Sequence, residues 1–397
     1  MHPLILGAIV GSVVTVVAGS VLRGRGYAAF IGVMLTIHTL VVVGLQDQLL
    51  RLAPLLVWLH SAALIHLLSL VWARLRPNWY RALVSIPAHF VLAATFLAIP
   101  WAVVAAVGLP PYGWWLPFGA ALLGVAQSLR AKEEVVDLVL DGVHMAELKR
   151  ASVVRRRKRP AEAGEEPLRL VQITDPHLGP FMSEERLRGI CERAVAAEPD
   201  LILLTGDFFT MEGRGSEDVL ARALAPLKAY EGKTFACFGN HDHEAPRSVA
   251  LGLAAAGVKL LVDDFTQVET RVGPVQIVGL DHVWSKRAAH YGEVFARLPE
   301  AGDALRLVLL HDPGGFKHLP LGEADLVLSG HTHGGHVGLL SLGLDRTSIG
   351  AIARMPDHGF WGRGPDRLYV HRANGHYGFP LRVGVPAEES VLRVHRG

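Results

Sequence analysis

The stretch SGHTHGGH, from Ser329 to His336, places three histidines and three glycines in one short turn. It follows the apolar run ADLVL, which is typical of a buried strand. Core packing does not require three imidazoles at one turn. Imidazole is the commonest side-chain metal ligand, and glycine lets the backbone approach a site closely. The spacing therefore indicates a ligand site at the end of this strand.

Four more polar clusters follow short apolar runs in the same way. Their side chains are Asp175 and His177; Asp207; Asn240, His241 and Asp242; and His311. A single Asp after a strand is more often a turn residue, and a single His is more often a satisfied core residue. Five such strand ends in one chain indicate one shared site, because open α/β sheets hold their ligands beyond the carboxyl ends of the strands.

The residue types in these clusters indicate the metals they could bind. Histidine, aspartate and asparagine without cysteine form a mixed nitrogen and oxygen set, which suits Mn, Fe or Zn and, less readily, Mg. Seven or eight such ligands are too many for one ion, and two divalent ions that share a carboxylate fit the number. Cys191 and Cys237 suggest neither a disulfide framework nor a cysteine zinc site.

At these residues the chain resembles the calcineurin-like metallophosphoesterases over about residues 168–395. The family pattern of Asp-x-His, Gly-Asp, Gly-Asn-His-Asp, a lone His and Gly-His-x-His occurs here in that order. The closing stretch NGHYGFPLRVGVPAEESVLRV resembles the bacterial branch that often carries membrane segments. That branch commonly has Gln at the position of His336. The resemblance implies a four-layer α/β/β/α sandwich.

The resemblance also implies a role for each matching residue. One metal would be held by Asp175, His177 and His333, the other by Asn240, His311 and His331, with Asp207 bridging both. His241 would lie beside the metals as the proton donor, and Asp242 would orient His241 or a neighbouring backbone group. His336, His243 and Arg382 are candidate substrate contacts, with supporting or solvated side chains as the alternative.

The implied chemistry is hydrolysis of a phosphate ester. Two metals bind the phosphate oxygens and hold a bridging hydroxide that attacks phosphorus in line. The leaving alkoxide takes its proton from His241. Phosphodiesterase and phosphomonoesterase activity are both open, and the membrane tether described next brings lipid-linked phosphates into consideration.

Residues 1–129 have the composition of a membrane region, with six Arg, no Lys and one acid, Asp47. A transmembrane helix needs about 20 apolar residues. Such stretches run roughly over 3–22, 27–46, 53–73 and 82–108, with a shorter one at about 112–129. We expect about five helices and a multi-pass integral membrane protein, with the bilayer as a partner.

Arginines lie between the first two stretches and between the third and fourth, which places these loops in the cytoplasm by the positive-inside rule. The side of the catalytic domain depends on whether the stretch 112–129 crosses. Arg130, Lys132 and the basic run from Lys149 to Arg159 favour the cytoplasm, and we expect the catalytic domain there.

The expected organisation is a transmembrane region (1–129), a linker with a leading strand and a basic run (130–167), and a phosphoesterase domain (168–397). Residues 130–397 hold 33 basic and 36 acidic side chains, so no nucleic-acid partner is expected. In the domain, strands are expected over Leu168–Thr174, Leu201–Thr205, Thr234–Phe238, Lys259–Val262, Val275–Leu280, Leu305–Leu310 and Leu326–Ser329. Helices are expected over about 184–197, 217–229, 246–256 and 285–298, and the segment from about 337 to 372 is expected to cover the site.

Three alternatives remain open at this point. The metal fold could serve a non-catalytic membrane sensor or scaffold, a nuclease variant of the same fold, or a regulator of a transport unit. The spans also contain His38, His60, His66 and His89. Intramembrane ionisable groups are functional candidates, and imidazoles that hydrogen-bond between packed helices are the alternative.

Overall fold

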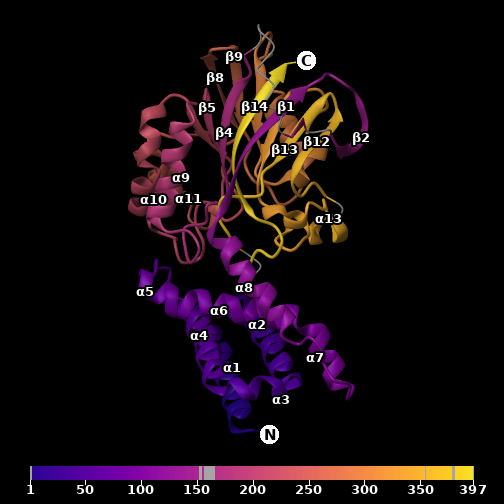
Figure 1. Ribbon diagram of the computed structural model, residues 1–397. Helices are drawn as coiled ribbons and strands as arrows, with labels where there is room; N and C mark the ends of the chain where they lie inside the picture. Colours follow the sequence, from indigo (N-terminus) through magenta and orange to yellow (C-terminus); the bar gives the residue numbers. More distant parts are fainter. Residues whose placement is uncertain (1, 152–153, 156–165, 354, 378–380, 397) are drawn as a thin grey trace. The chain divides into compact units, whose positions relative to one another are not determined.

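The computed structural model describes residues 2–151, 154–155, 166–353, 355–377 and 381–396 (Figure 1). The chain forms two compact units. The helical unit comprises Met1–Leu129 with the short segments Gly179–Phe181 and Tyr377–Val383. The catalytic unit comprises Arg130–Leu178, Met182–His376 and Gly384–Gly397.

In the helical unit, four segments are long and apolar enough to cross a membrane: Pro3–Arg23, Arg25–Gly44, Gln46–Ser69 and Asn78–Leu97. Short 3-10 and π turns interrupt the last two. The elements are α1 (Pro3–Arg23), α2 (Arg25–Gly44), α3 (Gln46–Leu49), η1 (Leu50–Leu52), α4 (Ala53–Ser69), α5 (Asn78–Tyr80), η2 (Arg81–Ser85), α6 (Ile86–Leu97), α7 (Ile99–Ala106) and α8 (Leu116–Leu129).

The fifth apolar stretch of the sequence differs from the other four. It forms α8, which has 14 residues and therefore covers about 21 Å, against about 30 Å for the hydrocarbon core of a bilayer. The four histidines of these apolar helices form two pairs. Nε2 of His38 lies 2.9 Å from Nδ1 of His60, and the rings of His66 and His89 are 4.7 Å apart. The contact between His38 and His60 agrees with imidazoles that hydrogen-bond between packed helices.

The catalytic unit is built on two seven-stranded sheets. The first has the order β3-β1-β14-β4-β5-β6-β7. Its strands are β3 (Val154–Arg155), β1 (Ala131–Leu140), β14 (Ala387–Arg396), β4 (Leu168–Ile173), β5 (Leu201–Leu204), β6 (Thr234–Ala236) and β7 (Lys259–Leu260). Strands β4 to β7 are parallel, and β14 joins β4 in the antiparallel sense.

The second sheet has the order β2-β12-β13-β11-β10-β9-β8. Its strands are β2 (Met145–Arg150), β12 (Gly359–Gly364), β13 (Asp366–Val370), β11 (Leu326–Ser329), β10 (Leu305–Leu309), β9 (Gly273–Gly279) and β8 (Asp264–Thr270). Strands β9, β10, β11 and β13 run parallel, so their carboxyl ends meet at one edge.

The core lies between the sheets and is filled by alternate side chains of both, among them Leu170, Leu203, Leu307 and Leu328. Helices cover the outer faces: α9 (Glu184–Ala196), α10 (Glu217–Leu224) and α11 (Pro246–Ala255) lie beside the first sheet in Figure 1, and α12 (Arg287–Phe295) packs against the second. The shorter helices are η3 (Ala225–Tyr230), η4 (Asp242–Glu244), η5 (Pro313–His318), η6 (His333–Gly335), η7 (Leu340–Leu342) and α13 (Ser348–Ile352). These layers confirm the predicted α/β/β/α fold.

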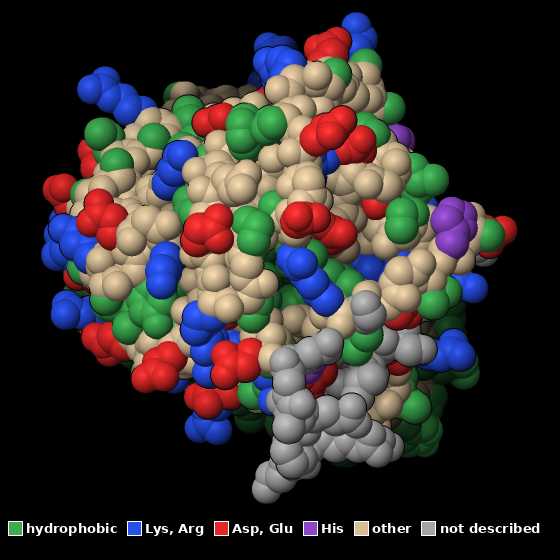
Figure 2. All heavy atoms as spheres, turned by 90° about the horizontal axis from the view of Figure 1, so that it is seen from above, with side chains coloured by type: hydrophobic (Ala, Val, Ile, Leu, Met, Phe, Trp, Pro, Cys, Tyr) green, Lys and Arg blue, Asp and Glu red, His purple; other side chains and the backbone are tan. Residues whose placement is uncertain are grey.

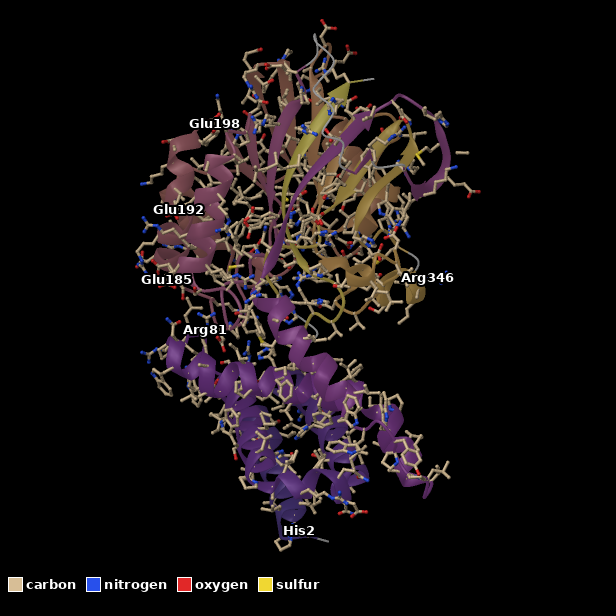
Figure 3. The ribbon with its side chains drawn as sticks, viewed as in Figure 1. His2, Arg81, Glu185, Glu192, Glu198 and Arg346 are labelled. Atoms are coloured by element: carbon tan, nitrogen blue, oxygen red, sulfur yellow. The ribbon has the colours of Figure 1, made fainter. Side chains whose placement is uncertain are left out.

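Helix α9 shows why these segments take the outer layer. Leu187, Ile190 and Ala194 recur at helical spacing and are buried, while Glu185 and Glu192 point away from the sheets (Figure 3). Ser183 caps the helix by accepting a hydrogen bond from the N–H of Arg186. An amphipathic stripe of this kind buries one face and leaves the other in water.

All seven strands expected from apolar runs are present, but several others were not predicted. The segment 130–151, expected as a linker with one strand, supplies β1 to the first sheet and β2 to the second. Part of the segment expected to cover the site forms β12 and β13. The charged run 156–165 lies outside the described residues.

Candidate metal and catalytic site

The candidate site lies at the carboxyl ends of β4, β5 and β6 of one sheet and β10 and β11 of the other. Six non-glycine residues there have positive φ, namely Asp175, His177, Asp207, His331, His333 and His336. Such backbone costs about 1–3 kcal/mol per residue and is concentrated at functional sites. The strand ends are therefore bent to bring ligand side chains together.

The first ligand group contains Asp175, His177 and His333, whose donor atoms lie within 4.8 Å of one another. Oδ1 of Asp175 is 3.8 Å from Nε2 of His177 and 3.4 Å from Nε2 of His333. The other oxygen of Asp175 accepts hydrogen bonds from the Thr174 hydroxyl at 2.6 Å and the His331 N–H at 3.0 Å. The His331 N–H is shared with Oδ1 at 3.1 Å, and Oδ1 is the oxygen that faces the imidazoles of His177 and His333.

The second group contains Asp207, His311 and His331, again within 4.8 Å. Nε2 of His311 lies 3.3 Å from Nδ1 of His331 and 3.2 Å from Oδ1 of Asn240. The amide oxygen of Asn240 therefore belongs with this group. The two groups contain all seven metal ligands that the resemblance implied.

Asp207 connects the groups. Its Oδ1 accepts a hydrogen bond from the His241 N–H at 2.8 Å. Its Oδ2 lies 3.5 Å from Nε2 of His177 in the first group and 3.2 Å from Nε2 of His311 in the second. A single oxygen between imidazoles of both groups is the arrangement that a bridging carboxylate requires.

Backbone carbonyls orient two of the imidazoles. Nδ1 of His311 lies 2.6 Å from the Thr205 carbonyl, and Nδ1 of His177 lies 3.3 Å from the Phe209 carbonyl. A carbonyl can only accept, so Nδ1 carries the proton and Nε2 faces the other ligands. Metal-binding histidines are held in this way by an acceptor at the second nitrogen.

Buried charges shift one another's pKa values in the site. Burial raises the pKa of Asp175 to about 6, with His311 opposing and Asp207 adding to the shift. Burial opposes a charge on His311, but Asp207 and Asp175 raise its pKa to about 10. Burial also acts to raise the pKa of Asp207, yet His311 and His177 lower it below its usual range. Two buried carboxylates thus favour positive charge, which divalent cations would supply.

Close backbone approach requires glycine at two positions. A Cβ at Gly330 would lie 2.1 Å from Oδ2 of Asp175, and one at Gly239 would lie 2.2 Å from Oδ1 of Asp207. Both distances are far shorter than a van der Waals contact, and both neighbouring atoms belong to candidate ligand carboxylates. The glycines let two loops pass directly behind the ligands.

His241 lies beside the first group, with its ring 5.6 Å from that of His177. Its Nδ1 is 3.0 Å from Oε1 of Glu244, and the other oxygen of Glu244 forms an ion pair with Arg214. Glu244 was not predicted from the sequence. The sequence feature that could have indicated it is its position three residues after His241, because a 3-10 turn brings residues at that spacing onto the same side.

The Asp242 carboxylate contacts the backbone of the site. It accepts hydrogen bonds from the N–H groups of Asp207 at 2.7 Å, Phe208 at 2.9 Å and Gly239 at 2.8 Å. Burial and Asp207 raise the pKa of Asp242 to about 7 despite these bonds. Asp242 was expected to orient either His241 or a neighbouring backbone group, and in the structure its carboxylate bonds to backbone groups. The carboxylate that contacts the His241 ring is that of Glu244.

The three candidate substrate contacts lie in different surroundings. His336 stacks on His333 at 4.7 Å and so lies against the first group. Nε2 of His243 is 2.9 Å from Oδ1 of Asp281, outside both groups. Arg382 is fully buried in a segment of the helical unit, where its N–H bonds to Ser128. Arg382 thus belongs to the helical unit, whereas both ligand groups belong to the catalytic unit.

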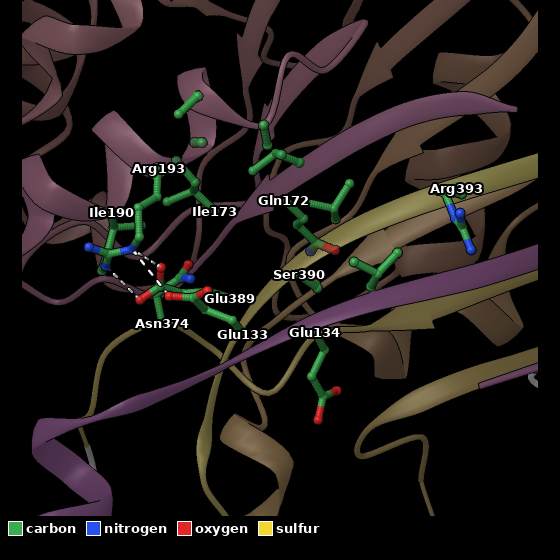
Figure 4. Close-up of a pocket in the computed structure, with 16 residues that line it drawn as sticks. Glu133, Glu134, Gln172, Ile173, Ile190, Arg193, Asn374, Glu389, Ser390 and Arg393 are labelled. Carbon is green, nitrogen blue, oxygen red and sulfur yellow. Dashed lines mark hydrogen bonds and ion pairs between the residues drawn. The ribbon is translucent and has the colours of Figure 1, made fainter. Parts of the chain in front are cut away.

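A cavity of about 810 Å³ lies elsewhere, on the outer side of the first sheet between α9 and strands β1, β4 and β14 (Figure 4). Arg193 and Glu389 form a bidentate ion pair at 2.8 and 2.9 Å beside it. Asn374, which also lines it, accepts a hydrogen bond from the Thr174 N–H at 2.7 Å, next to Asp175. No member of the two ligand groups lines this cavity.

The similarity of this chain to known proteins agrees with a metal site of this kind. Residues 168–335 match the family of calcineurin-like phosphoesterases. Phosphodiesterase YaeI of Escherichia coli K12 is 30% identical over 175 residues, 43% of this chain and 62% of that protein. An uncharacterized metallophosphoesterase of Aquifex aeolicus is 27% identical over 232 residues, 57% of this chain and 85% of that protein.

A third relative is a transmembrane protein with metallophosphoesterase domain from Danio rerio, 26% identical over 234 residues, 56% of this chain and 52% of that protein. The chain thus matches about three fifths of YaeI and about half of the zebrafish protein. Residues 168–335 of the catalytic unit are thus similar to the calcineurin-like phosphoesterases, as the motifs predicted. This family supports a phosphoester hydrolase that binds two divalent metals.

Proposed function

We propose that the protein is a membrane-anchored phosphohydrolase with two divalent metals, Mn, Fe or Zn, and Mg less readily. The observation that carries this proposal is the position of Asp207, whose Oδ2 lies between His177 and His311 of the two ligand groups. Asp175, His177 and His333 would hold one metal. Asn240, His311 and His331 would hold the other.

When bound, two such cations neutralise phosphoryl oxygens and activate a water for attack on phosphorus. The side chains of the protein transfer the proton and position the reacting groups. His241 delivers a proton to the leaving oxygen, and Glu244 keeps its ring turned to the site through the 3.0 Å contact at Nδ1. Asp242 fixes the loops that carry Asp207 and Gly239. His336 would contact the phosphate, a role that its stacking on His333 supports.

We assign phosphodiesters as the first class of substrate to test, since the relative YaeI is named a phosphodiesterase. The apolar helices make a lipid-linked ester the natural source of such a substrate. Nucleic acid is not expected, because residues 130–397 are near neutral and acidic and basic side chains are interspersed on the face shown in Figure 2.

We further propose that the helical unit is multi-pass and that the catalytic unit faces the cytoplasm. Arg23 ends α1 and Arg25 begins α2, and Arg74 and Arg76 follow α4, so these connections would be cytoplasmic. The catalytic unit is on the same side only if α8 and the residues before it complete a fifth crossing. A green fluorescent protein fused after Gly397 should fluoresce, whereas active alkaline phosphatase in the same position would place the unit outside.

The enzymatic proposal is tested with the full chain in detergent, stripped of metal and reloaded with Mn²⁺. The substrates are bis(4-nitrophenyl) phosphate, diphenyl phosphate and their monoesters. Their hydrolysis is measured for wild type, for His241→Ala and for His144→Ala, a control at an exposed residue outside the site. We expect metal-dependent hydrolysis. The His241 variant should lose about 10²- to 10⁴-fold on phenyl esters, and less on 4-nitrophenyl esters, whose leaving group needs less protonation. Metal-loaded protein that hydrolyses none of these esters would contradict the proposal.

A further inference from the structure

A loop from Asp281 to Arg287, between β9 and α12, lies next to the second ligand group. The ring of His282 is 6.4 Å from the rings of both His311 and His331. His282 is not a member of either ligand group. It therefore forms part of the wall beside the site.

The loop is held at both ends. Oδ1 of Asp281 accepts the His282 N–H at 2.8 Å and lies 2.9 Å from Nε2 of His243. At the other end, Arg287 donates to the Val283 carbonyl at 2.9 Å and pairs with Asp312 at 2.7 Å. Asp312 directly follows the ligand His311. The position of His282 is thus fixed relative to the metal ligands.

The side chain of His282 has an unused polar atom. The residue is 7% exposed, and its Nε2 is buried without a hydrogen-bond partner among the residues that the structure describes. A buried polar atom without a partner costs about 1–3 kcal/mol. Such an atom next to a ligand group is placed to bond to something that enters the site.

Trp284 extends the same wall outward. Its ring lies 4.5 Å from that of His282, at an interplanar angle of 80°, and the residue is 73% exposed. Most of the indole is therefore open to a second ring. Aromatic side chains in this position stack on flat groups, and the stacking of a base on an aromatic ring is sequence-tolerant.

We propose that His282 and Trp284 form a subsite for a flat aromatic ring carried by the phosphate ester, such as an aryl group or a nucleobase. Trp284 stacks on the ring, and Nε2 of His282 hydrogen-bonds to the ester. This inference rests on the proposed function, because the phosphate must lie at the metals for the ring to reach Trp284. An exposed Trp could also cover an alkyl chain, and the test below separates the two.

The test measures binding by isothermal titration calorimetry to the Mn²⁺-loaded full chain in detergent. The probes are phenyl phosphate, cyclohexyl phosphate and inorganic phosphate, so that ring size is matched and only aromaticity differs. We expect phenyl phosphate to bind more tightly than cyclohexyl phosphate. Trp284→Ala should weaken phenyl phosphate about 5- to 150-fold and leave inorganic phosphate unchanged. Trp284→Phe should retain part of the preference.

Two further variants sharpen the result. His282→Leu, which keeps the volume but removes the ring nitrogens, should weaken both organic esters about 2- to 12-fold. Leu251→Ala, an exposed apolar residue on α11, should change nothing. If Trp284→Ala weakens the binding of phenyl and cyclohexyl phosphate equally, Trp284 covers an alkyl chain. If it weakens neither, Trp284 is not part of the site. Either result overturns the inference. Failure of inorganic phosphate to bind would instead refute the proposed function, and this inference with it.

Discussion

Asp242 should stabilise the catalytic unit through the backbone of two ligand loops. Its carboxylate accepts three backbone hydrogen bonds, from Asp207, Phe208 and Gly239, and the residue is 1% exposed. In Asp242→Ala the three N–H groups lose their acceptor while they remain buried. Each such loss costs about 1–3 kcal/mol, or about 3–9 kcal/mol together, a large part of the 5–15 kcal/mol by which proteins are typically stable.

The assay is thermal unfolding of the full chain in detergent, followed by near-UV circular dichroism. For a unit of this size, about 3 kcal/mol lowers Tm by about 6 °C or more. Asp242→Asn should fall between wild type and the Ala variant, because one amide oxygen can accept two of the three bonds. Asp303→Ala, at an exposed turn, serves as the control. An Ala variant that melts within about 2 °C of wild type and binds two metals would show that Asp242 does not hold the two loops.

Three other changes give separate expectations. Gly330→Ala should abolish metal binding at Asp175, measured by titration with Mn²⁺, because its Cβ would lie 2.1 Å from the carboxylate, whereas Gly292→Ala on α12 meets nothing within 4 Å and should be tolerated. Glu244→Gln should lower kcat roughly 10- to 100-fold with little change in KM; an unchanged kcat would exclude a positioning role. Burial alone would raise the pKa of Glu388, but His371 and Arg372 lower it from 4.5 to about 2. The depressed pKa gives stability that is present above pH 4.5 and lost as the pH falls toward 2. The unfolding free energy of wild type should therefore drop up to about 3 kcal/mol more than that of Glu388→Gln over this range, and equal drops in urea titrations would contradict the shift.

The sequence predicted that the candidate ligands lie close together, because each of them follows an apolar run typical of a buried strand. β4, β5, β6, β10 and β11 all consist of such runs, and the candidate ligands follow their carboxyl ends. β14 was missed because AEESVLRVHR lacks the uninterrupted apolar run by which the other strands were recognised. Its pairing with β1 is parallel and joins segments more than 240 residues apart, which no local pattern specifies.

The supporting residues of the site were harder to predict. Glu244 and His282 stand in short turns, and their roles depend on which side chain the turn brings near them. Asp242 was recognised from its motif, but its carboxylate accepts hydrogen bonds from the backbone N–H groups of residues 207 and 208. These residues are distant in sequence, so only the folded chain shows that they lie beside Asp242. Arg382 was a candidate substrate contact with a solvated side chain as the alternative, and the structure shows it buried in a segment of the helical unit. A charged residue type alone does not place a side chain.

If the Asp207 carboxylate joins two metal sites, its replacement must change how many metal ions the chain holds. The full chain is loaded with Mn²⁺, freed of excess metal by gel filtration and analysed by mass spectrometry for metal per chain. We expect about two ions in wild type. Asp207→Asn, which removes the charge between His177 and His311, should retain one or none. Two ions in the Asp207 variant, or none in wild type, would contradict the account.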